Sequence, residues 1–124
     1  MLVEPTLANA ARLEHAVREF AGASLAYFGI SVEELARPKF GFFMGGEPDR
    51  IDVLTRIAGV SFARAWRGRT SARIVGVEVS VLGLDELIAA KRASARERPP
   101  GSVKALQDAA DLSWLTEARR SKRL

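Results

Sequence analysis

The stretch between residues 40 and 55 most constrains the fold, because it carries the pattern of a β-hairpin. Large apolar residues alternate with smaller or outward-facing ones over Phe40–Met44, as side chains do along a strand. A run rich in Gly, Pro and Asp, residues 45–49, then forms a predicted turn into a second strand, Arg50–Thr55. A second hairpin is predicted from Thr70–Ile74 and Val77–Leu82.

Along the sequence, predicted helices come before, between and after the two hairpins. Helical spacing of apolar residues and capping signals predict helices over Thr6–Ala21, Ser31–Ala36, Ser61–Trp66, Leu84–Ala95 and Ser102–Glu117. Helices around a strand-rich centre are typical of the α+β class. We therefore expect an α+β fold with a mixed or antiparallel sheet of about four to five strands, flanked by helices.

Length and composition favour one compact domain. The chain has 124 residues, 48% of them hydrophobic, which suffices to bury a core without disulfides. We expect a single domain over residues 1–118. The basic run that follows, residues 119–124, is predicted to be a solvated C-terminal tail.

Several functional classes are disfavoured by what the sequence lacks. It has no cysteine and one histidine, which argues against disulfides, thiolate chemistry and zinc sites. The histidine, His15, falls on the predicted outer side of the first helix, which disfavours a serine-histidine hydrolase. No segment approaches the roughly 18 apolar residues of a membrane span, so a cytoplasmic protein is expected. The formal charge of +4 favours anionic partners.

Asp52 is the acid that most needs an explanation. Alternation along the second strand places Ile51 and Val53 on one face and Asp52 on the other. Acids are depleted in strands and costly to bury without a partner. A metal, another cation, an arginine such as Arg50 or Arg73, or an edge position would each account for it.

The penultimate helix has a lysine within its apolar stripe. Lys91 lies seven residues after Leu84, on the side that also carries Leu87 and Ile88. The lysine either extends past the core or pairs with a carboxylate, or it directs its charge towards a phosphate or towards Asp52. The sequence leaves these alternatives open.

The last helix is predicted to pack through an apolar stripe. Its members are Val103, Leu106, Ala110 and Trp114. Asp108 and Asp111 fall beside this stripe. They are expected either to be solvated or to form salt bridges with the basic linker, residues 96–101.

The order of these segments resembles a known family. The segments are Arg50-Ile51-Asp52-Val53-Leu54-Thr55, Gly59-Val60-Ser61-Phe62, Val75-Gly76-Val77-Glu78-Val79, Val81-Leu82-Gly83-Leu84-Asp85-Glu86-Leu87-Ile88, Lys91-Arg92 and Gln107-Asp108-Ala109-Ala110-Asp111-Leu112. In this order and spacing they resemble small bacterial proteins of the nucleotidyltransferase family, which have the polymerase-beta type of fold. The resemblance covers nearly the whole chain.

The resemblance implies a role for Asp52 and also an incomplete site. Family members hold Mg²⁺ with two acids of an Asp-x-Asp motif and a third acid from a neighbouring strand, and Asp52 matches this third acid. The Asp-x-Asp and the preceding Gly-Ser motif are absent, and Met1–Thr6 looks like the end of that stretch. The resemblance thus implies a truncated domain in which Asp52 is the catalytic and metal-binding position. Lys91, Arg50 and Arg73 are its candidate substrate-binding residues.

Two functional hypotheses follow. The first is a nucleotidyltransferase-like protein that is inactive or depends on a partner, with residual nucleotide and magnesium binding. An unpaired sheet edge that a second subunit could cover leads us to expect a homodimer. The alternative is a small basic module, without catalysis, that binds nucleic acid or a protein partner of the toxin-antitoxin type. It rests on the charge and on arginines near Trp66.

Overall fold

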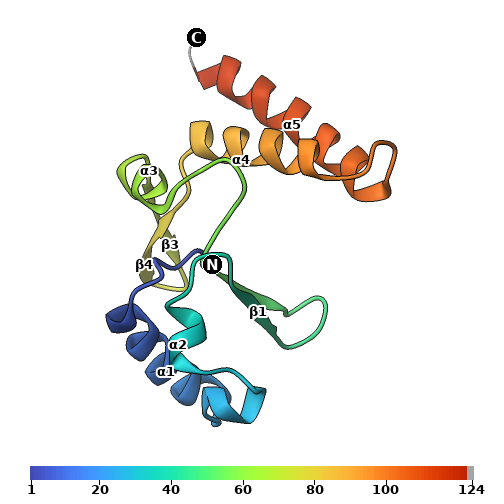
Figure 1. Ribbon diagram of the computed structural model, residues 1–124. Coiled ribbons are helices and arrows are strands. Elements are labelled where there is room, and N and C mark those ends of the chain that lie inside the picture. The colour runs from blue at the N-terminus through green and yellow to red at the C-terminus, as the bar shows by residue number, and fades with distance from the viewer. Residues whose placement is uncertain (123–124) are drawn as a thin grey trace. The chain divides into compact units, whose positions relative to one another are not determined.

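The computed structural model describes residues 1–122 and confirms the α+β class. The chain forms two compact units, Met1–Ile57 and the residues from Ala58 onward. Each unit combines helices with one two-stranded antiparallel sheet (Figure 1). The two predicted hairpins therefore belong to different units.

The first unit begins with helix α1 (Leu7–Ala21), whose ends are explained by local signals. The backbone N–H of Asn9 donates to the Thr6 hydroxyl at 3.1 Å, so Thr6 is the N-cap, as predicted. At the other end Gly22 adopts a left-handed conformation with φ of 66°, and its N–H donates to the Arg18 carbonyl. The helix buries the side chains of Ala10, Leu13 and Val17.

A short 3₁₀ helix, η1 (Leu25–Phe28), and helix α2 (Val32–Leu35) connect α1 to the hairpin. The predicted capping box is present at the start of α2. The Glu34 N–H donates to the Ser31 hydroxyl, and the Ser31 N–H donates to the Glu34 carboxylate. These two bonds satisfy backbone donors that would otherwise lack a partner.

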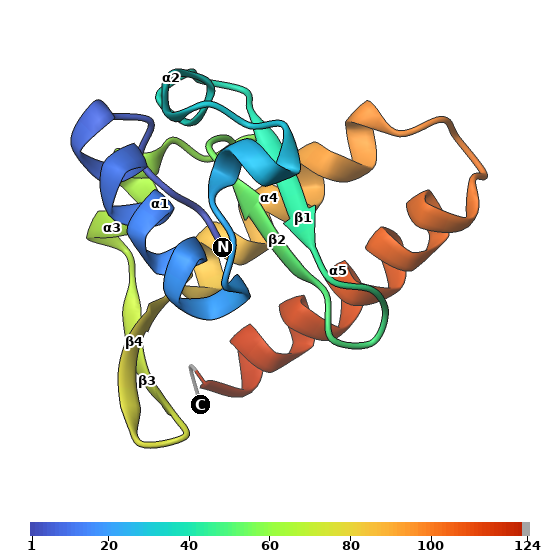
Figure 2. The same ribbon diagram turned by 90° about the horizontal axis from the view of Figure 1, so that it is seen from below.

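The hairpin of the first unit consists of β1 (Gly41–Met44) and β2 (Ile51–Leu54), which pair antiparallel (Figure 2). Val53 is fully buried on its inner face. Asp52 lies on the outer face, opposite Phe43 in the register. The predicted alternation along β2 is thus confirmed.

The core of the first unit is small and apolar. It consists of Ala10, Leu13, Val17, Leu25, Leu35 and Val53. One buried polar residue, Thr55, lies beside it, and its side-chain hydroxyl has hydrogen-bond partners. Its hydroxyl donates to the Arg37 carbonyl and accepts from the Phe40 N–H, both at 2.8 Å. Thr55 thereby ties the loop after α2 to the end of β2.

The second unit begins with helix α3 (Phe62–Arg67), capped by the Ser61 hydroxyl. Strands β3 (Thr70–Ile74) and β4 (Val77–Val81) follow as an antiparallel hairpin. Its two turn residues, Val75 and Gly76, have φ values of 49° and 77°. Two consecutive positive φ angles are typical of a type I′ turn, which suits the twist of a hairpin.

Helix α4 (Leu84–Glu97) and helix α5 (Val103–Lys122) form an antiparallel pair (Figures 1 and 2). Contacts run in opposite order along the two helices. Lys91 of α4 meets Asp108 and Asp111 near the start of α5, and Asp85 at the start of α4 meets Arg119 near the end of α5.

The predicted packing face of α5 is wrong. Val103, Leu106 and Trp114 are 81%, 63% and 71% exposed, and Ala110 is exposed as well. The buried residues of α5 are instead Asp108 and Leu115. The reason is a set of ion pairs to α4, which turns the polar side of the helix inward.

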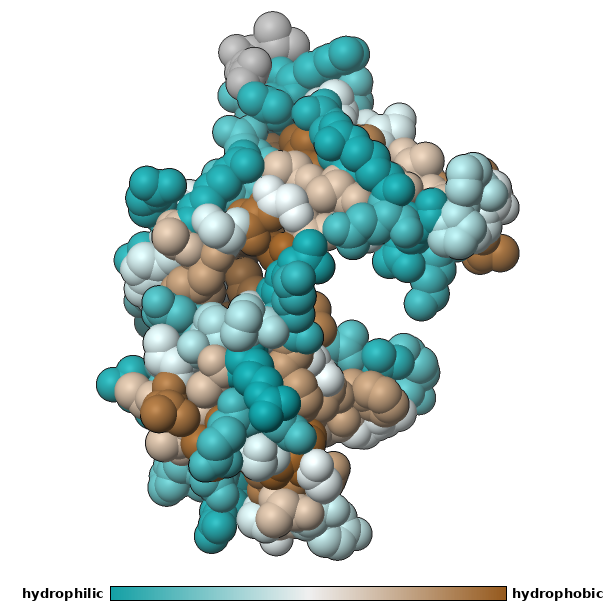
Figure 3. Space-filling model, in the orientation of Figure 1, coloured by the Kyte–Doolittle hydropathy of each residue, from teal (hydrophilic) through white to brown (hydrophobic). Residues whose placement is uncertain are grey.

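The space-filling view shows apolar areas of the surface in brown between hydrophilic areas in teal (Figure 3).

Two further predictions concern the end of the domain and the size of the sheet. The expected boundary between the domain and its basic tail, at residue 118, falls inside α5, which continues through Lys122. Arg123 and Leu124 lie outside the described residues. Among residues 1–122 the strands form two separate two-stranded sheets, with one isolated parallel bridge between Leu2 and Leu54. A single sheet of four to five strands stays a prediction.

No helix among the described residues is long and apolar enough to cross a membrane.

The Val75-Gly76 turn generates a prediction about stability. Val75 is 97% exposed and β-branched at a positive φ, a conformation that asparagine tolerates better. Val75→Asn is expected to raise the free energy of unfolding by about 1 kcal/mol, because it relieves strain and gives up no packing. Urea unfolding followed by circular dichroism measures the change.

The matched control is Val77→Asn. Val77 is also exposed, at 61%, but starts strand β4 without a positive φ, so its replacement should bring no gain. An unchanged or lower midpoint for Val75→Asn would contradict the assignment of strain to this turn.

Candidate functional site

The outer face of the β1–β2 hairpin carries the residue singled out by the sequence, Asp52. Its side chain is 49% exposed, and its Oδ1 atom accepts a hydrogen bond from Arg50 Nε at 2.6 Å. Arg50 immediately precedes β2, and its side chain lies beside that of Asp52. Of the partners considered for Asp52, the structure places Arg50 beside it.

Phe43 completes this face and was not singled out from the sequence. It lies opposite Asp52 across the hairpin and is 58% exposed. The Arg50 guanidinium carbon lies 4.1 Å from the centre of the Phe43 ring, a cation–π contact. Alternation in Phe40–Met44 already placed Phe43 outward, but its pairing with Asp52 depends on the register. Phe43, Arg50 and Asp52 together are called the outer-face cluster below.

The first residues of the chain lie along the far side of β2. Leu2 forms a parallel bridge with Leu54, and the Val3 N–H donates to the Leu54 carbonyl at 2.8 Å. The Met1 amino group donates to the Asp52 carbonyl at 2.6 Å. Strand β2 is therefore flanked by β1 on one side and by the N-terminal segment on the other, with Asp52 next to Met1.

The residues of the outer-face cluster do not form a complete metal centre. No group of three or more His, Asp or Glu side chains able to hold an ion occurs within residues 1–122. Asp52 supplies one carboxylate, and an arginine already contacts it. A two-metal site of the kind that the resemblance implies needs more acids than this face offers.

Lys91 is held by carboxylates of α5. Its ammonium nitrogen lies 2.9 Å from Asp111 Oδ2 and 3.4 Å from Asp108 Oδ1. The hydrogen bond from Lys91 to Asp111 is the main cause of the raised pKa of Lys91, partly opposed by burial. Of the alternatives left open by the sequence, pairing with a carboxylate describes these surroundings.

Asp108 is the buried centre of the α4–α5 contact. The side chain of Arg98 donates to Asp108 Oδ2 at 2.6 Å, and the Ser94 hydroxyl donates to the same oxygen at 3.3 Å. The hydrogen bond from Arg98 is the main cause of the lowered pKa of Asp108, with Lys91 adding to it and burial opposing it. Arg98 belongs to the basic linker, so of the two alternatives expected for Asp108 the structure has the salt bridge to the linker. Asp111 pairs with Lys91 of α4 instead.

Two further residues were considered from the sequence, Arg73 and His15. Arg73 is exposed on β3, opposite Glu78 of β4 in the strand register. His15 has an exposed side chain near Glu19 on α1, as its position on the outer side of the helix predicted.

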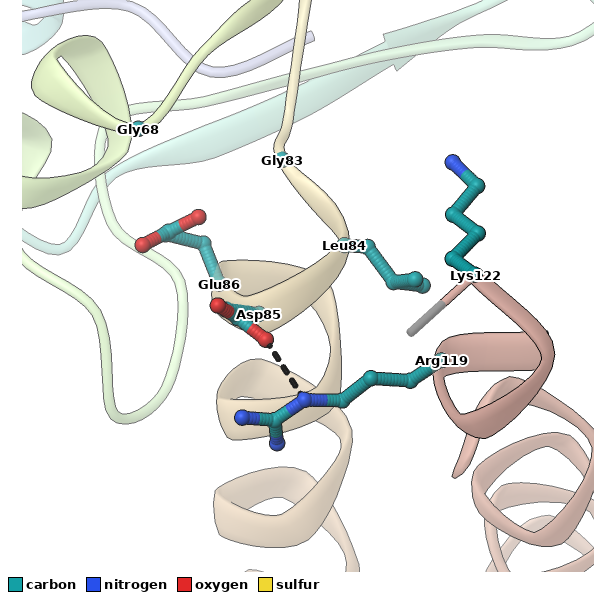
Figure 4. A pocket seen from close by; sticks show the side chains of 7 residues that line it. All are labelled: Gly68, Gly83, Leu84, Asp85, Glu86, Arg119 and Lys122. Atoms are coloured by element: carbon teal, nitrogen blue, oxygen red, sulfur yellow. Dashed lines mark ion pairs between the residues drawn. The ribbon is translucent and has the colours of Figure 1, made fainter. Parts of the chain in front are cut away.

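A hollow of about 360 Å³ lies in the second unit, between the start of α4 and the end of α5 (Figure 4). Arg119 Nε lies 3.0 Å from Asp85 Oδ1, but the nitrogen has no hydrogen bond, so this contact is an ion pair. Glu86 lies 3.8 Å from Arg64 Nε. Both acids of this hollow thus face arginines.

Comparisons with protein-family models, curated proteins and solved structures found no match. The resemblance to nucleotidyltransferases therefore stays a hypothesis drawn from the sequence segments.

The pKa of Asp108 generates a prediction about acid stability. A carboxyl group whose pKa is lowered on folding stabilises the protein above its unfolded value, about 3.9, and loses this effect as pH falls through the folded value. Asp108→Asn should therefore lower the unfolding midpoint at pH 7. The difference from the unmodified protein should shrink steadily between pH 5 and pH 3. Urea unfolding at a series of pH values measures it.

Asp49→Asn is the control, because Asp49 is exposed in the turn between β1 and β2. Its effect on the midpoint should be small at every pH. An Asp108→Asn effect that stays constant from pH 7 to pH 3 would contradict the charged role of Asp108.

Proposed function

We propose that this chain is a nucleotidyltransferase-like protein that binds a nucleoside triphosphate with magnesium weakly at Asp52 and does not transfer a nucleotide by itself. The observation that carries the proposal is the half-exposed Asp52 carboxylate on β2. This strand is flanked by β1 and by the N-terminal segment, a setting compatible with the third acid of the family.

The number of carboxylates supports weak binding without transfer. Magnesium commonly contacts a protein through one or two carboxylates and takes its remaining ligands from phosphates and water. Asp52 can supply one such contact to a magnesium ion that arrives with a triphosphate. Two-metal phosphoryl chemistry requires further acids, and residues 1–122 hold no cluster that offers them.

The other two members of the outer-face cluster have chemistry suited to a nucleotide. The Arg50 guanidinium presents paired N–H donors that match phosphate oxygens, and it is 40% exposed. Phe43 offers an exposed ring on which a base can stack. Lys91 contacts Asp108 and Asp111 in the second unit. Substrate-binding roles for Lys91 and Arg73 stay predictions.

The proposal also includes completion of the site by another strand. The Met1 amino group bonds to the Asp52 carbonyl, so a strand that continues this line would pass close to Asp52. Acids on such a strand would take the part of the Asp-x-Asp pair that the resemblance implies. The expected sheet of four to five strands, and a partner or second copy at this edge, belong to this part of the proposal.

Calorimetric titration with ATP and with CTP, in the presence and absence of magnesium, tests the proposal. We expect magnesium-dependent binding with a dissociation constant on the order of 1 mM. Asp52→Asn should weaken it at least about tenfold, because the carboxylate that contacts magnesium is lost. Asp49→Asn, which removes an equal charge from the neighbouring turn, should bind as the unmodified protein does.

Two outcomes would sink the proposal. One is the absence of any magnesium-dependent binding of either nucleotide. The other is binding that survives Asp52→Asn unchanged, which would place the nucleotide elsewhere. Circular dichroism of each variant verifies that the fold is intact.

A second candidate function has a specific observation in its favour. Trp66 on α3 is 50% exposed, and the Arg69 guanidinium carbon lies 3.8 Å from its ring centre. Stacked aromatic and arginine side chains bind single-stranded nucleic acid without sequence preference. Binding of a single-stranded oligonucleotide that falls steeply with salt, ignores magnesium and is lost in Trp66→Ala would favour this module over the nucleotide site.

A further inference from the structure

The exposed face of α5 is a continuous apolar stripe. Val103, Leu106, Ala110 and Trp114 follow one another at intervals of three, four and four residues, so they share one side of the helix. The four residues extend along about 16 Å of α5. All are exposed, and Val103, Leu106 and Trp114 are so by well over half.

The charged residues of the same turns point elsewhere. Asp108 and Asp111 lie towards α4, where Lys91 and Arg98 hold them. The centre of the stripe therefore carries no charge. An apolar helix face of this kind in contact with water commonly marks an interaction site.

The spacing of the stripe fits a second copy of the same chain. The midpoint between Val103 and Trp114 and the midpoint between Leu106 and Ala110 both fall near residue 108. Two α5 helices packed antiparallel about a twofold axis at this point would place Trp114 against Val103, and Leu106 against Ala110, of the other copy. Each contact then joins a large side chain to a smaller one, which is the requirement for close helix packing.

The available area fits a weak dimer. A specific interface buries about 800 Å² on each partner. Trp114 is 71% exposed, and a tryptophan side chain alone can bury about 150–250 Å². With Val103, Leu106 and Ala110, the stripe supplies roughly half of a standard interface, and exposed polar residues beside it, such as Gln107 and Ser113, supply its rim.

We propose that the Val103–Trp114 stripe of α5 is the contact surface of a homodimer, with two α5 helices antiparallel and the paired α4–α5 hairpins forming a four-helix arrangement. This proposal does not depend on nucleotide binding at Asp52. It differs from pairing of sheet edges because it uses side chains of the second unit alone.

A pair of variants on adjacent residues gives the test. Ala110 is inside the stripe, whereas Ala109 is exposed but turned about 100° away around the helix. Ala110→Lys places a charge at the centre of the contact, and Ala109→Lys makes the same chemical change outside it. Sedimentation velocity over a range of protein concentrations measures the monomer–dimer equilibrium of each.

We expect dimers of the unmodified protein with a dissociation constant on the order of 10 μM. Ala109→Lys should leave this constant within about twofold, and Ala110→Lys should raise it at least about tenfold. A protein that stays monomeric well above this concentration overturns the proposal. Dimers that Ala110→Lys does not weaken also overturn it, because they must form through another surface.

Fluorescence provides an independent readout of the same contact. The chain has two tryptophans, so Trp66→Phe leaves Trp114 as the emitting residue. As the protein concentration rises through the dimerisation range, the Trp114 emission should shift to shorter wavelength, because the ring leaves water. In the Ala110→Lys background this shift should disappear. Emission that does not change with concentration would contradict the placement of Trp114 in the contact.

Discussion

The buried carboxylate of Asp108 is the constraint on which the arrangement of the second unit depends. A charge taken out of water needs partners, and Asp108 finds them in Arg98, Lys91 and Ser94. Lys91 and Ser94 belong to α4, and Arg98 directly follows it. The three residues therefore determine which side of α5 faces α4. The rotation of α5 follows from this network rather than from its apolar residues.

Two functional consequences come from this rotation. Lys91 forms ion pairs with carboxylates of α5 and so stabilises the helix pair. The candidate nucleotide contacts are Phe43, Arg50 and Asp52 of the first unit. At the same time the apolar residues of α5 are left exposed, where they form the proposed dimer contact.

Local features of the fold were predictable from the sequence. The Thr6 cap, the Ser31–Glu34 capping box and the outward position of Asp52 depend on residues within four positions of one another. The rotation of α5 was not, because helical periodicity assumes that the apolar side packs inward, whereas distant ion pairs decided otherwise. The pairing of Leu2 with Leu54 and the role of Phe43 likewise depend on contacts and register that no local pattern carries.

The central functional claim is that Asp52, rather than any acid of α4 or α5, receives a nucleotide-bound metal ion. Nuclear magnetic resonance with Mn²⁺ and ATP tests it directly, since the paramagnetic ion broadens the amide signals of nearby residues. The account predicts broadening centred on Phe43 and Asp52, since the Asp52 side chain is 49% exposed whereas that of Asp108 is 6% exposed. Broadening centred on Asp108 and Asp111, or on Asp85 and Glu86, or no broadening at all, would contradict it.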